Sequence, residues 1–328
     1  MSGVVVTGAD ISRLRIDVHA HVWTDEYLDL MSECGREPDD MAAQRDQGAG
    51  LGAKELESRF AQMDAAGVDL QVLSVAPLSP HFEREQDAVR VARAANDLYA
   101  ETVRRWPDRF RALAALPFPH PDAALRELGR ALDELGMLGV SMTTSILGRS
   151  IADPAFEPVY AELDRRGSAL FIHPSGCGAL SPLITEHRLT WQLGAPVEDT
   201  VAAMQLINAG IPSRYPRLRI GLAHLGGALP LLLGRADNLN PWEAPETPEP
   251  PSVAARRLWY DTVSHAYPPA LRAAVEAFGA DRLMLGSDYP YAQGEAYTAA
   301  VSHIGSAGLR AEDAAAIADH NAAAFLFG

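Results

Sequence analysis

Short runs of apolar and β-branched residues recur along the chain, and each precedes a longer stretch in which apolar residues return with helical spacing. Eight of the short runs predict strands, which cover residues 15–19, 68–75, 109–116, 139–144, 169–173, 219–224, 258–263 and 282–287. The longer stretches predict helices over residues 55–66, 85–106, 121–135, 154–166, 197–209, 268–278 and 311–327. Gly67, Gly136 and Gly167 stand directly after three of these helices, where a left-handed C-terminal cap favours glycine.

The number of repeated units decides between two α/β architectures. A doubly wound sheet usually has fewer parallel strands and carries a glycine-rich phosphate turn, and no G-x-G-x-x-G pattern follows a predicted strand. Eight strand-then-helix units in 328 residues match a (β/α)₈ barrel better. The chain therefore predicts an α/β fold of the (β/α)₈ TIM-barrel type, with residues 1–328 forming a single domain.

Three segments interrupt the alternation of predicted strands and helices. Residues 27–54 follow the first predicted strand, and residues 176–196 follow the fifth. Long βα-loops of a barrel usually build the substrate pocket, so we expect these two inserted loops to cover an active site. The third segment, residues 238–252, is rich in proline and glutamate and predicts an exposed loop.

Five ionisable residues stand at the C-terminal ends of predicted strands. His19 and His21 lie at the end of the first strand, His173 ends the fifth, His224 ends the sixth, and Asp288 follows the eighth. In a barrel, the strand ends face one common cavity. Because side chains alternate along a strand, His19 and His21 lie on the same side, and both can point inward.

Imidazoles combined with one carboxylate suit Zn²⁺ and similar divalent ions. An H-x-H pair alone is weak evidence, and Asp288 alone is equally compatible with a cap of the turn after a strand. The whole set at equivalent strand ends favours a metal site. His224 can also be a core histidine packed under Gly226 and Gly227, but its place beside a metal favours acid–base catalysis.

Several motifs resemble the amidohydrolase-related decarboxylases, the family typified by aminocarboxymuconate-semialdehyde decarboxylase. The motifs are IDVHAH, FIHPSG, WQLGAPVEDT, LAHLGGALP and LMLGSDYPY, with Asn321-Ala322 near the C-terminus, so the likeness covers nearly the whole chain. The resemblance implies that His224 is the catalytic acid/base and that Trp191 lines the substrate pocket. It also implies a set of metal ligands, which are His19, His21, His173 and Asp288.

The number of metal ions depends on a lysine. Binuclear amidohydrolases bridge their two metals with a carboxylated lysine at the end of the fourth strand. The predicted fourth strand, GVSMTT, has no lysine, and Lys54, the only lysine of the chain, precedes the second strand. We therefore predict one divalent ion, with Zn²⁺ as the first expectation and Mn²⁺ as the alternative.

The same residues can perform two reactions. In non-oxidative decarboxylation, the metal orients the substrate and a protonated group delivers H⁺ to the carbon that loses CO₂, so no redox cofactor is needed. In the hydrolysis of a cyclic amide, lactone or ester, metal-bound hydroxide attacks a carbonyl. The resemblance favours decarboxylation of an unsaturated or aromatic carboxylic acid, of the aminocarboxymuconate-semialdehyde or hydroxybenzoate type, with His224 and Asp288 as catalytic residues. The hydrolase reading stays open as the alternative.

A carboxylated substrate calls for a cationic partner, and arginine pairs with a carboxylate in bidentate fashion. The resembled decarboxylase places an arginine in the loop after the first strand. Arg45 is the nearest candidate here, two positions out of register, and Arg36 lies in the same loop. A solvated surface position is the alternative for both arginines. Trp191 can stack on a planar substrate, although a loop tryptophan can also simply cover core.

Composition narrows the classes of partner. A net charge of −15 repels nucleic acid, so the expected partner is a small-molecule carboxylate. The chain shows no secretory signal pattern and no run near the roughly 20 apolar residues of a membrane span, so we expect a cytoplasmic protein with no membrane contact. Cys34 and Cys177 are too few for a disulfide framework and are expected to be reduced thiols. A homodimer is compatible with the resemblance.

Overall fold

The computed structural model describes residues 14–328, and hydrogen bonds join its strands into a closed ring. One parallel sheet has the order β1 (Ile16–His21), β2 (Leu70–Ser74) and β3 (Phe110–Ala112). A second has the order β11 (Leu283–Met284), β10 (Trp259–Asp261), β9 (Arg219–Leu222), β8 (Ala169–His173), β5 (Gly139–Thr143) and β4 (Ala114–Ala115). β3 and β4 are successive pieces of one strand. On the other side of the ring, the amide of Val18 in β1 donates to the carbonyl of Leu285 just after β11, at 3.0 Å. The eight strand positions confirm the predicted (β/α)₈ barrel.

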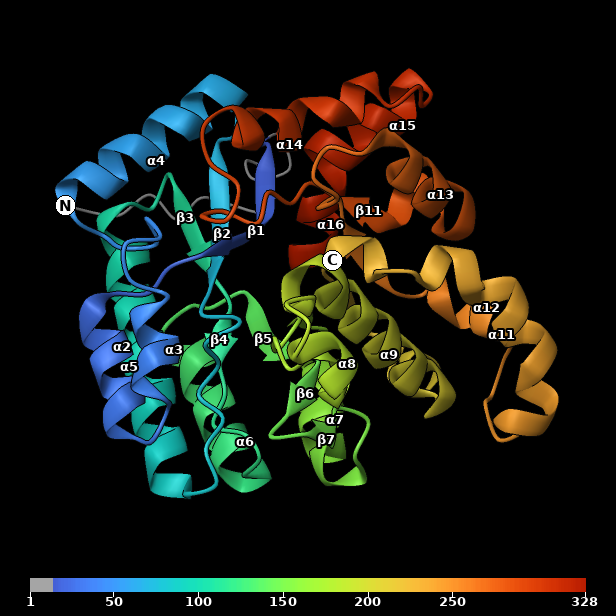
Figure 1. Ribbon diagram of the computed structural model, residues 1–328, viewed down its shortest axis with the longest axis horizontal. Helices are drawn as coiled ribbons and strands as arrows, with labels where there is room; N and C mark the ends of the chain where they lie inside the picture. Colours follow the sequence, from blue (N-terminus) through green and yellow to red (C-terminus); the bar gives the residue numbers. More distant parts are fainter. Residues whose placement is uncertain (1–13) are drawn as a thin grey trace.

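Helices surround these strands on the outside of the ring (Figure 1). The two remaining strands, β6 (Ser145–Ile146) and β7 (Arg149–Ser150), form a separate antiparallel pair that is not part of the ring. The α-helices are α2 (Asp25–Glu33), α3 (Pro38–Ala42), α4 (Ala53–Ala66), α5 (Glu85–Arg105), α6 (Pro121–Gly129), α7 (Glu157–Arg166), α8 (Pro182–Thr185), α9 (Ala195–Asn208), α10 (Ile211–Arg214), α11 (Leu229–Glu243), α12 (Pro251–Ala255), α13 (Pro268–Phe278), α14 (Glu295–Ser306), α15 (Ala311–Ala315) and α16 (Asn321–Phe327). Short 3₁₀ or π segments are η1 (Arg130–Glu134), η2 (Pro154–Phe156), η3 (Gly178–Leu180), η4 (Thr190–Gly194), η5 (His224–Gly226), η6 (Ala280–Arg282) and η7 (Ala316–His320).

The structure corrects several predicted bounds. The segment 238–252 is not a continuous loop, because α11 continues to Glu243 and α12 begins at Pro251. Leu229 and Leu233 bury one side of α11, and this packing holds a helix whose polar C-terminal half is typical of a loop. The helices α11 and α14 were not predicted, and the two inserted loops contain α2 and α3 after β1, and η3, α8 and η4 after β8. None of the helices between residues 14 and 328 combines the length and apolar character that a bilayer crossing requires.

The last helix, α16, packs against the barrel strands and contributes to the core at the end opposite the site. Phe325 is fully buried beside Phe171 of β8, which lies inside the ring. Gly221 of β9 leaves room for the phenyl ring of Phe325, since a Cβ at position 221 would lie 2.9 Å from that side chain. The guanidinium of Arg219 donates to the carbonyl of Leu326 at 3.1 Å. The C-terminal helix therefore leaves the other end of the barrel for the cavity.

A bulge in β1 decides which of its side chains face inward. Val18 and His19 together lie opposite the single residue Val72 of β2. The extra residue interrupts the alternation of side chains along the strand. Val18 therefore packs in the barrel core, while the next residue, His19, and then His21 also face the interior. Regular alternation would have turned either Val18 or the two histidines outward.

Candidate metal centre and active site

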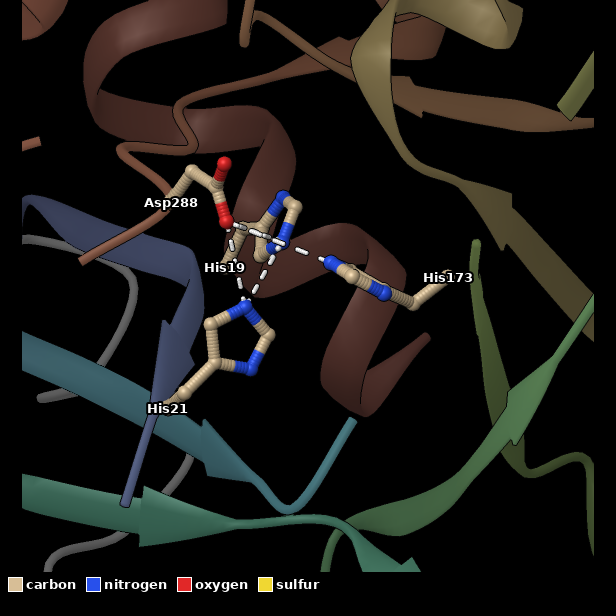
Figure 2. Close-up of side chains that lie close together, drawn as sticks. All are labelled: His19, His21, His173 and Asp288. Carbon is tan, nitrogen blue, oxygen red and sulfur yellow. Dashed lines mark hydrogen bonds and ion pairs between the residues drawn. The ribbon is translucent and has the colours of Figure 1, made fainter. Parts of the chain in front are cut away.

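Four side chains of the kind that ligate metals converge at the C-terminal mouth of the barrel. His19 and His21 come from β1, His173 ends β8, and Asp288 lies in the loop after β11. Their ligand atoms all lie within 4.8 Å of one another. Figure 2 shows the imidazoles turned toward one oxygen of Asp288, which is 3.1 Å from His21 Nε2, 3.2 Å from His19 Nε2 and 3.9 Å from His173 Nε2. The structure thus brings together the four residues predicted as ligands.

Each of the three imidazoles is oriented through its other ring nitrogen. His19 Nδ1–H donates to Asp261 Oδ2 of β10 at 2.5 Å, and His173 Nδ1–H donates to the carbonyl of the next residue at 2.8 Å. His21 Nδ1 is hydrogen-bonded to the hydroxyl of Ser74 at the end of β2, at 3.2 Å. Such partners fix the tautomer and the ring orientation of metal-binding histidines. All three Nε2 atoms are therefore directed at the same point.

The charges of the four groups follow from burial and from one another. Burial lowers the pKa of His21 to about 3 and also lowers the pKa of His173. Burial opposes protonation of His19 as well, but the carboxylates of Asp288 and Asp261 raise its pKa to about 9. Burial works against ionisation of Asp288, yet the facing histidines hold its pKa well below its usual range. Neutral imidazoles and an ionised carboxylate are the forms that bind a metal, so metal binding at this site requires His19 to give up its extra proton.

The backbone that carries Asp288 is held in an unusual conformation by β1. Asp288 has a φ of 63°, in the left-handed region that non-glycine residues rarely adopt. Its amide donates to the carbonyl of His19 at 2.9 Å, and the hydroxyl of the preceding residue, Ser287, donates to Asp17 at 2.6 Å. Asp17 is fully buried and also accepts from the side-chain amide of Gln71. This network points Asp288 at the histidines.

His224 lies next to the cluster at the start of η5. Its Nδ1 is 2.8 Å from Asp199 Oδ2 of α9, and its Nε2 is 3.7 Å from Asp288 Oδ2. Its amide donates to Asp261 Oδ1 at 2.9 Å. Burial opposes protonation of His224, but Asp199 and Asp288 raise its pKa well above its usual value. Burial raises the pKa of Asp199 to about 7, although the imidazole acts in the opposite direction. The two carboxylates therefore favour the protonated form of His224 beside Asp288.

A cavity of about 610 Å³ opens above these groups. His173, His224 and Asp288 reach its surface, so the cluster is accessible from the cavity. Trp191 and Tyr291 stand at its exposed side, 53% and 42% exposed, with their rings stacked at a centroid distance of 6.5 Å and an angle of 26°. The other lining residues are Ala43, Gln44, Gln47, Gln192, Ala195, Pro196, Leu225, Gly227, Val263, Ser264, His265 and Ala270. Both inserted loops contribute to this set.

The structure places the two arginine candidates away from the cavity lining. Arg45 is paired with Asp25 at 2.8 Å and with Asp29 at 2.5 Å, on the outer side of the inserted loop. Arg36 is mostly buried, donates to a main-chain carbonyl at 3.1 Å and lies over the ring of Phe82. Both guanidinium groups thus have protein partners, Arg45 on α2 and Arg36 in the segment between β2 and α5. Neither residue lines the cavity in the described chain.

Several residues of the site were not identified from the sequence. Asp261 ends a strand just as the candidate ligands do, so its position was a signal that could have found it. Asp199 lies in a helix, where nothing in the local pattern distinguishes it from a surface carboxylate. Gln44, Gln47 and Gln192 lie in the inserted segments, whose fold the pattern did not predict. His265, which follows β10, also lines the cavity.

One protein family matches almost the whole of this chain. The family model described as amidohydrolase matches residues 16–328. This chain belongs to the amidohydrolase family. The matched region of the amidohydrolase begins at β1 and contains the four convergent residues and His224.

Several proteins similar to this chain are named decarboxylases. This chain is 32% identical over 242 residues to a 2-amino-3-carboxymuconate-6-semialdehyde decarboxylase of Dictyostelium discoideum. The match covers 72% of this chain and 67% of the relative. The chain is also 32% identical over 259 residues to a gamma-resorcylate decarboxylase of Rhizobium radiobacter, a match that covers 72% of this chain and 76% of that relative. A dihydroxybenzoic acid decarboxylase structure from Polaromonas sp. JS666, with bound manganese and the inhibitor 2-nitroresorcinol, is 25% identical. Its TM-score is 0.80, with 96% of this chain and 97% of the other covered. These relatives confirm the resemblance that the motifs indicated.

Proposed function

We propose that this amidohydrolase is a metal-dependent, non-oxidative decarboxylase of an aromatic or unsaturated carboxylic acid. The observation that carries the proposal is the three-histidine, one-aspartate cluster at the bottom of a cavity, in a chain whose relatives are decarboxylases. A carboxylate, a planar organic group and a proton donor can meet there.

We propose that His19, His21, His173 and Asp288 hold one divalent ion. The fit is supported by the donor set, because the imidazoles direct their Nε2 atoms at one point while each Nδ1 is engaged elsewhere. Zn²⁺ suits imidazole with carboxylate, and Mn²⁺ is supported by the manganese in the Polaromonas decarboxylase. Lys54, the only lysine, is exposed on α4, so no carboxylated lysine bridges a second ion.

The reaction needs a Lewis acid and a proton. When bound, the ion polarises and orients the oxygens of the substrate. The bond from the carboxylate to its carbon then breaks, CO₂ leaves, the electron pair stays on the carbon, and a proton forms the new C–H bond. We propose that His224 supplies this proton from Nε2. Asp288 is proposed to hold the proton at that nitrogen by charge, since its Oδ2 is 3.7 Å away.

The cavity lining favours one class of substrate within this reaction. Trp191 and Tyr291 offer aromatic faces to a planar group. Gln44 and Gln47 offer uncharged hydrogen-bonding groups, and neither arginine nor lysine is among the lining residues of the described chain. A second carboxylate would lack a cationic partner there. We therefore propose the hydroxybenzoate type of acid, with one carboxylate, rather than a dicarboxylate of the aminocarboxymuconate type.

A substrate panel tests the reaction class. Protein loaded with Zn²⁺ or Mn²⁺ is incubated with hydroxybenzoates, alkylated salicylates and muconate-type acids, and CO₂ release is measured together with the decarboxylated product. The matched control is His224→Gln, which we expect to lower turnover by about 10²-fold to 10⁴-fold, the contribution of a general acid, while keeping its metal. If no acid releases CO₂ while lactones, esters or cyclic amides are cleaved, the protein is a hydrolase and the proposal is wrong. A metal content near two ions per chain would contradict the single-ion site.

A further inference from the structure

The loop that carries His224 packs directly on helix α9. A Cβ added to Gly227 would lie 1.9 Å from the carbonyl oxygen of Pro196, so only glycine allows this approach. The hydroxyl of Thr200 accepts from the amide of Ala228 at 2.8 Å, one residue further along the loop. The position of α9 relative to this loop is therefore defined by two contacts, three and four residues after His224, which makes α9 a rigid support for a contact with the imidazole.

That contact comes from Asp199. Its side chain is fully buried, and its Oδ2 is 2.8 Å from His224 Nδ1. Its other oxygen, Oδ1, has no hydrogen-bond partner within residues 14–328. A buried carboxylate that lacks partners is costly, and the bond to His224 is the interaction that offsets this cost. A fully buried acid with a single polar contact, to a group lining the cavity, calls for a functional explanation.

The main chain of His224 is held separately. Its φ is 52° and that of Leu225 is 56°, so two non-glycine residues in succession adopt the left-handed conformation. The amide of His224 donates to Asp261 Oδ1, which fixes the backbone but leaves the χ angles of the imidazole free. Asp199 acts on the ring itself. The backbone and the ring thus have different anchors, and only one of them determines which nitrogen faces the cavity.

We propose that Asp199 is a positioning residue that fixes the tautomer and orientation of His224, so that Nε2 is presented to the substrate and to Asp288. The carboxylate accepts Nδ1–H and thereby leaves Nε2 as the nitrogen that exchanges a proton with the reacting carbon. A ring free to rotate about χ2 would present Nδ1 or a carbon atom to the cavity for part of the time. This inference rests on the proposed role of His224, but it does not depend on which acid is the substrate.

The test is a double-mutant cycle between Asp199 and His224 in the metal-loaded, full-length protein. Asp199→Asn keeps the shape of the side chain, but its amide can present either a donor or an acceptor to Nδ1. We expect kcat to fall by about 10-fold to 10⁴-fold, the range that a positioned acid–base group contributes, while KM changes by less than about threefold. Asp199→Ser is the second variant, in case the asparagine variant does not fold. In the His224→Gln background, either change should have no further effect on kcat.

Glu198→Gln is the matched control. Glu198 is the preceding residue on α9 and is also buried, but its carboxylate accepts from the amides of Ser175 and Gly178 and does not contact His224. Its effect should therefore multiply with that of His224→Gln. The inference is overturned if Asp199→Asn keeps full kcat, if it lowers kcat equally in both backgrounds, or if its loss is explained by lost metal. Should the wild type hydrolyse lactones rather than release CO₂, the same cycle run on that reaction tests the inference independently.

Discussion

Asp261 connects His19, a proposed metal ligand, to the loop that carries His224, and replacing it with asparagine tests the orientation of His19. The Oδ1 atom accepts from the amides of His224 and Val263, both at 2.9 Å, while Oδ2 accepts from His19 Nδ1 at 2.5 Å. In Asp261→Asn, the carbonyl oxygen must stay with the two amide donors, because an NH₂ group there would face two N–H groups. The NH₂ group therefore faces His19 Nδ1, which can only accept from it if its proton moves to Nε2.

A proton on Nε2 would occupy the position from which His19 is proposed to bind the metal. Loss of such a supporting contact typically weakens metal binding by about 10- to 100-fold. This corresponds to about 1.4 to 2.8 kcal/mol of binding free energy. We expect a decrease in Mn²⁺ and Zn²⁺ affinity in this range or above it, because Asp261 supports both the charge and the tautomer of His19.

The affinity is measured by titrating metal-free protein with each ion in competition with a fluorescent chelator. Asp199→Asn is the matched control, since it also removes a buried carboxylate from a histidine at the cavity but does not touch a proposed ligand. Its affinity should stay within about threefold of the wild type, well below the loss expected of a ligand partner. If Asp261→Asn binds both ions as tightly as the wild type, while circular dichroism shows the same fold, the tautomer argument is refuted.

Four other perturbations have defined outcomes. Phe325→Ala should lower the free energy of unfolding by about 3 to 5 kcal/mol in a denaturant titration, because it empties a fully buried site beside Phe171; an unchanged midpoint would contradict the role of α16. Trp191→Ala should raise KM more than it lowers kcat, since its ring lines the exposed side of the cavity. Arg45→Ala should change KM by less than about twofold, because a surface ion pair contributes little; a tenfold rise would place Arg45 in substrate binding after all. Dialysis against a chelator should eliminate turnover, and Mn²⁺ or Zn²⁺ should restore it; activity that survives complete metal removal would exclude the proposed mechanism.

The sequence alone determined the barrel and the identity of the convergent residues. Strand and helix periods are local properties, so eight repeats could be counted without any knowledge of packing. The position at a strand end then sufficed to select His19, His173 and Asp288, because barrel topology brings all such ends to one face. The same logic could have reached Asp261, which ends β10, but the seventh predicted strand, residues 258–263, places it inside the strand rather than at its end.

Only the tertiary structure decided how these residues are held and what surrounds them. His19 and Asp261 are 242 residues apart, and His224 and Asp199 are 25 apart on different elements, so no local pattern reports their hydrogen bonds. The bulge that turns both Val18 and His19 inward depends on pairing with β2. The partners of Arg45 depend on how the first inserted loop folds back on itself. Contacts of this kind are set by the packing of whole elements, whereas the choice of ligands is set by the chain's own periodicity.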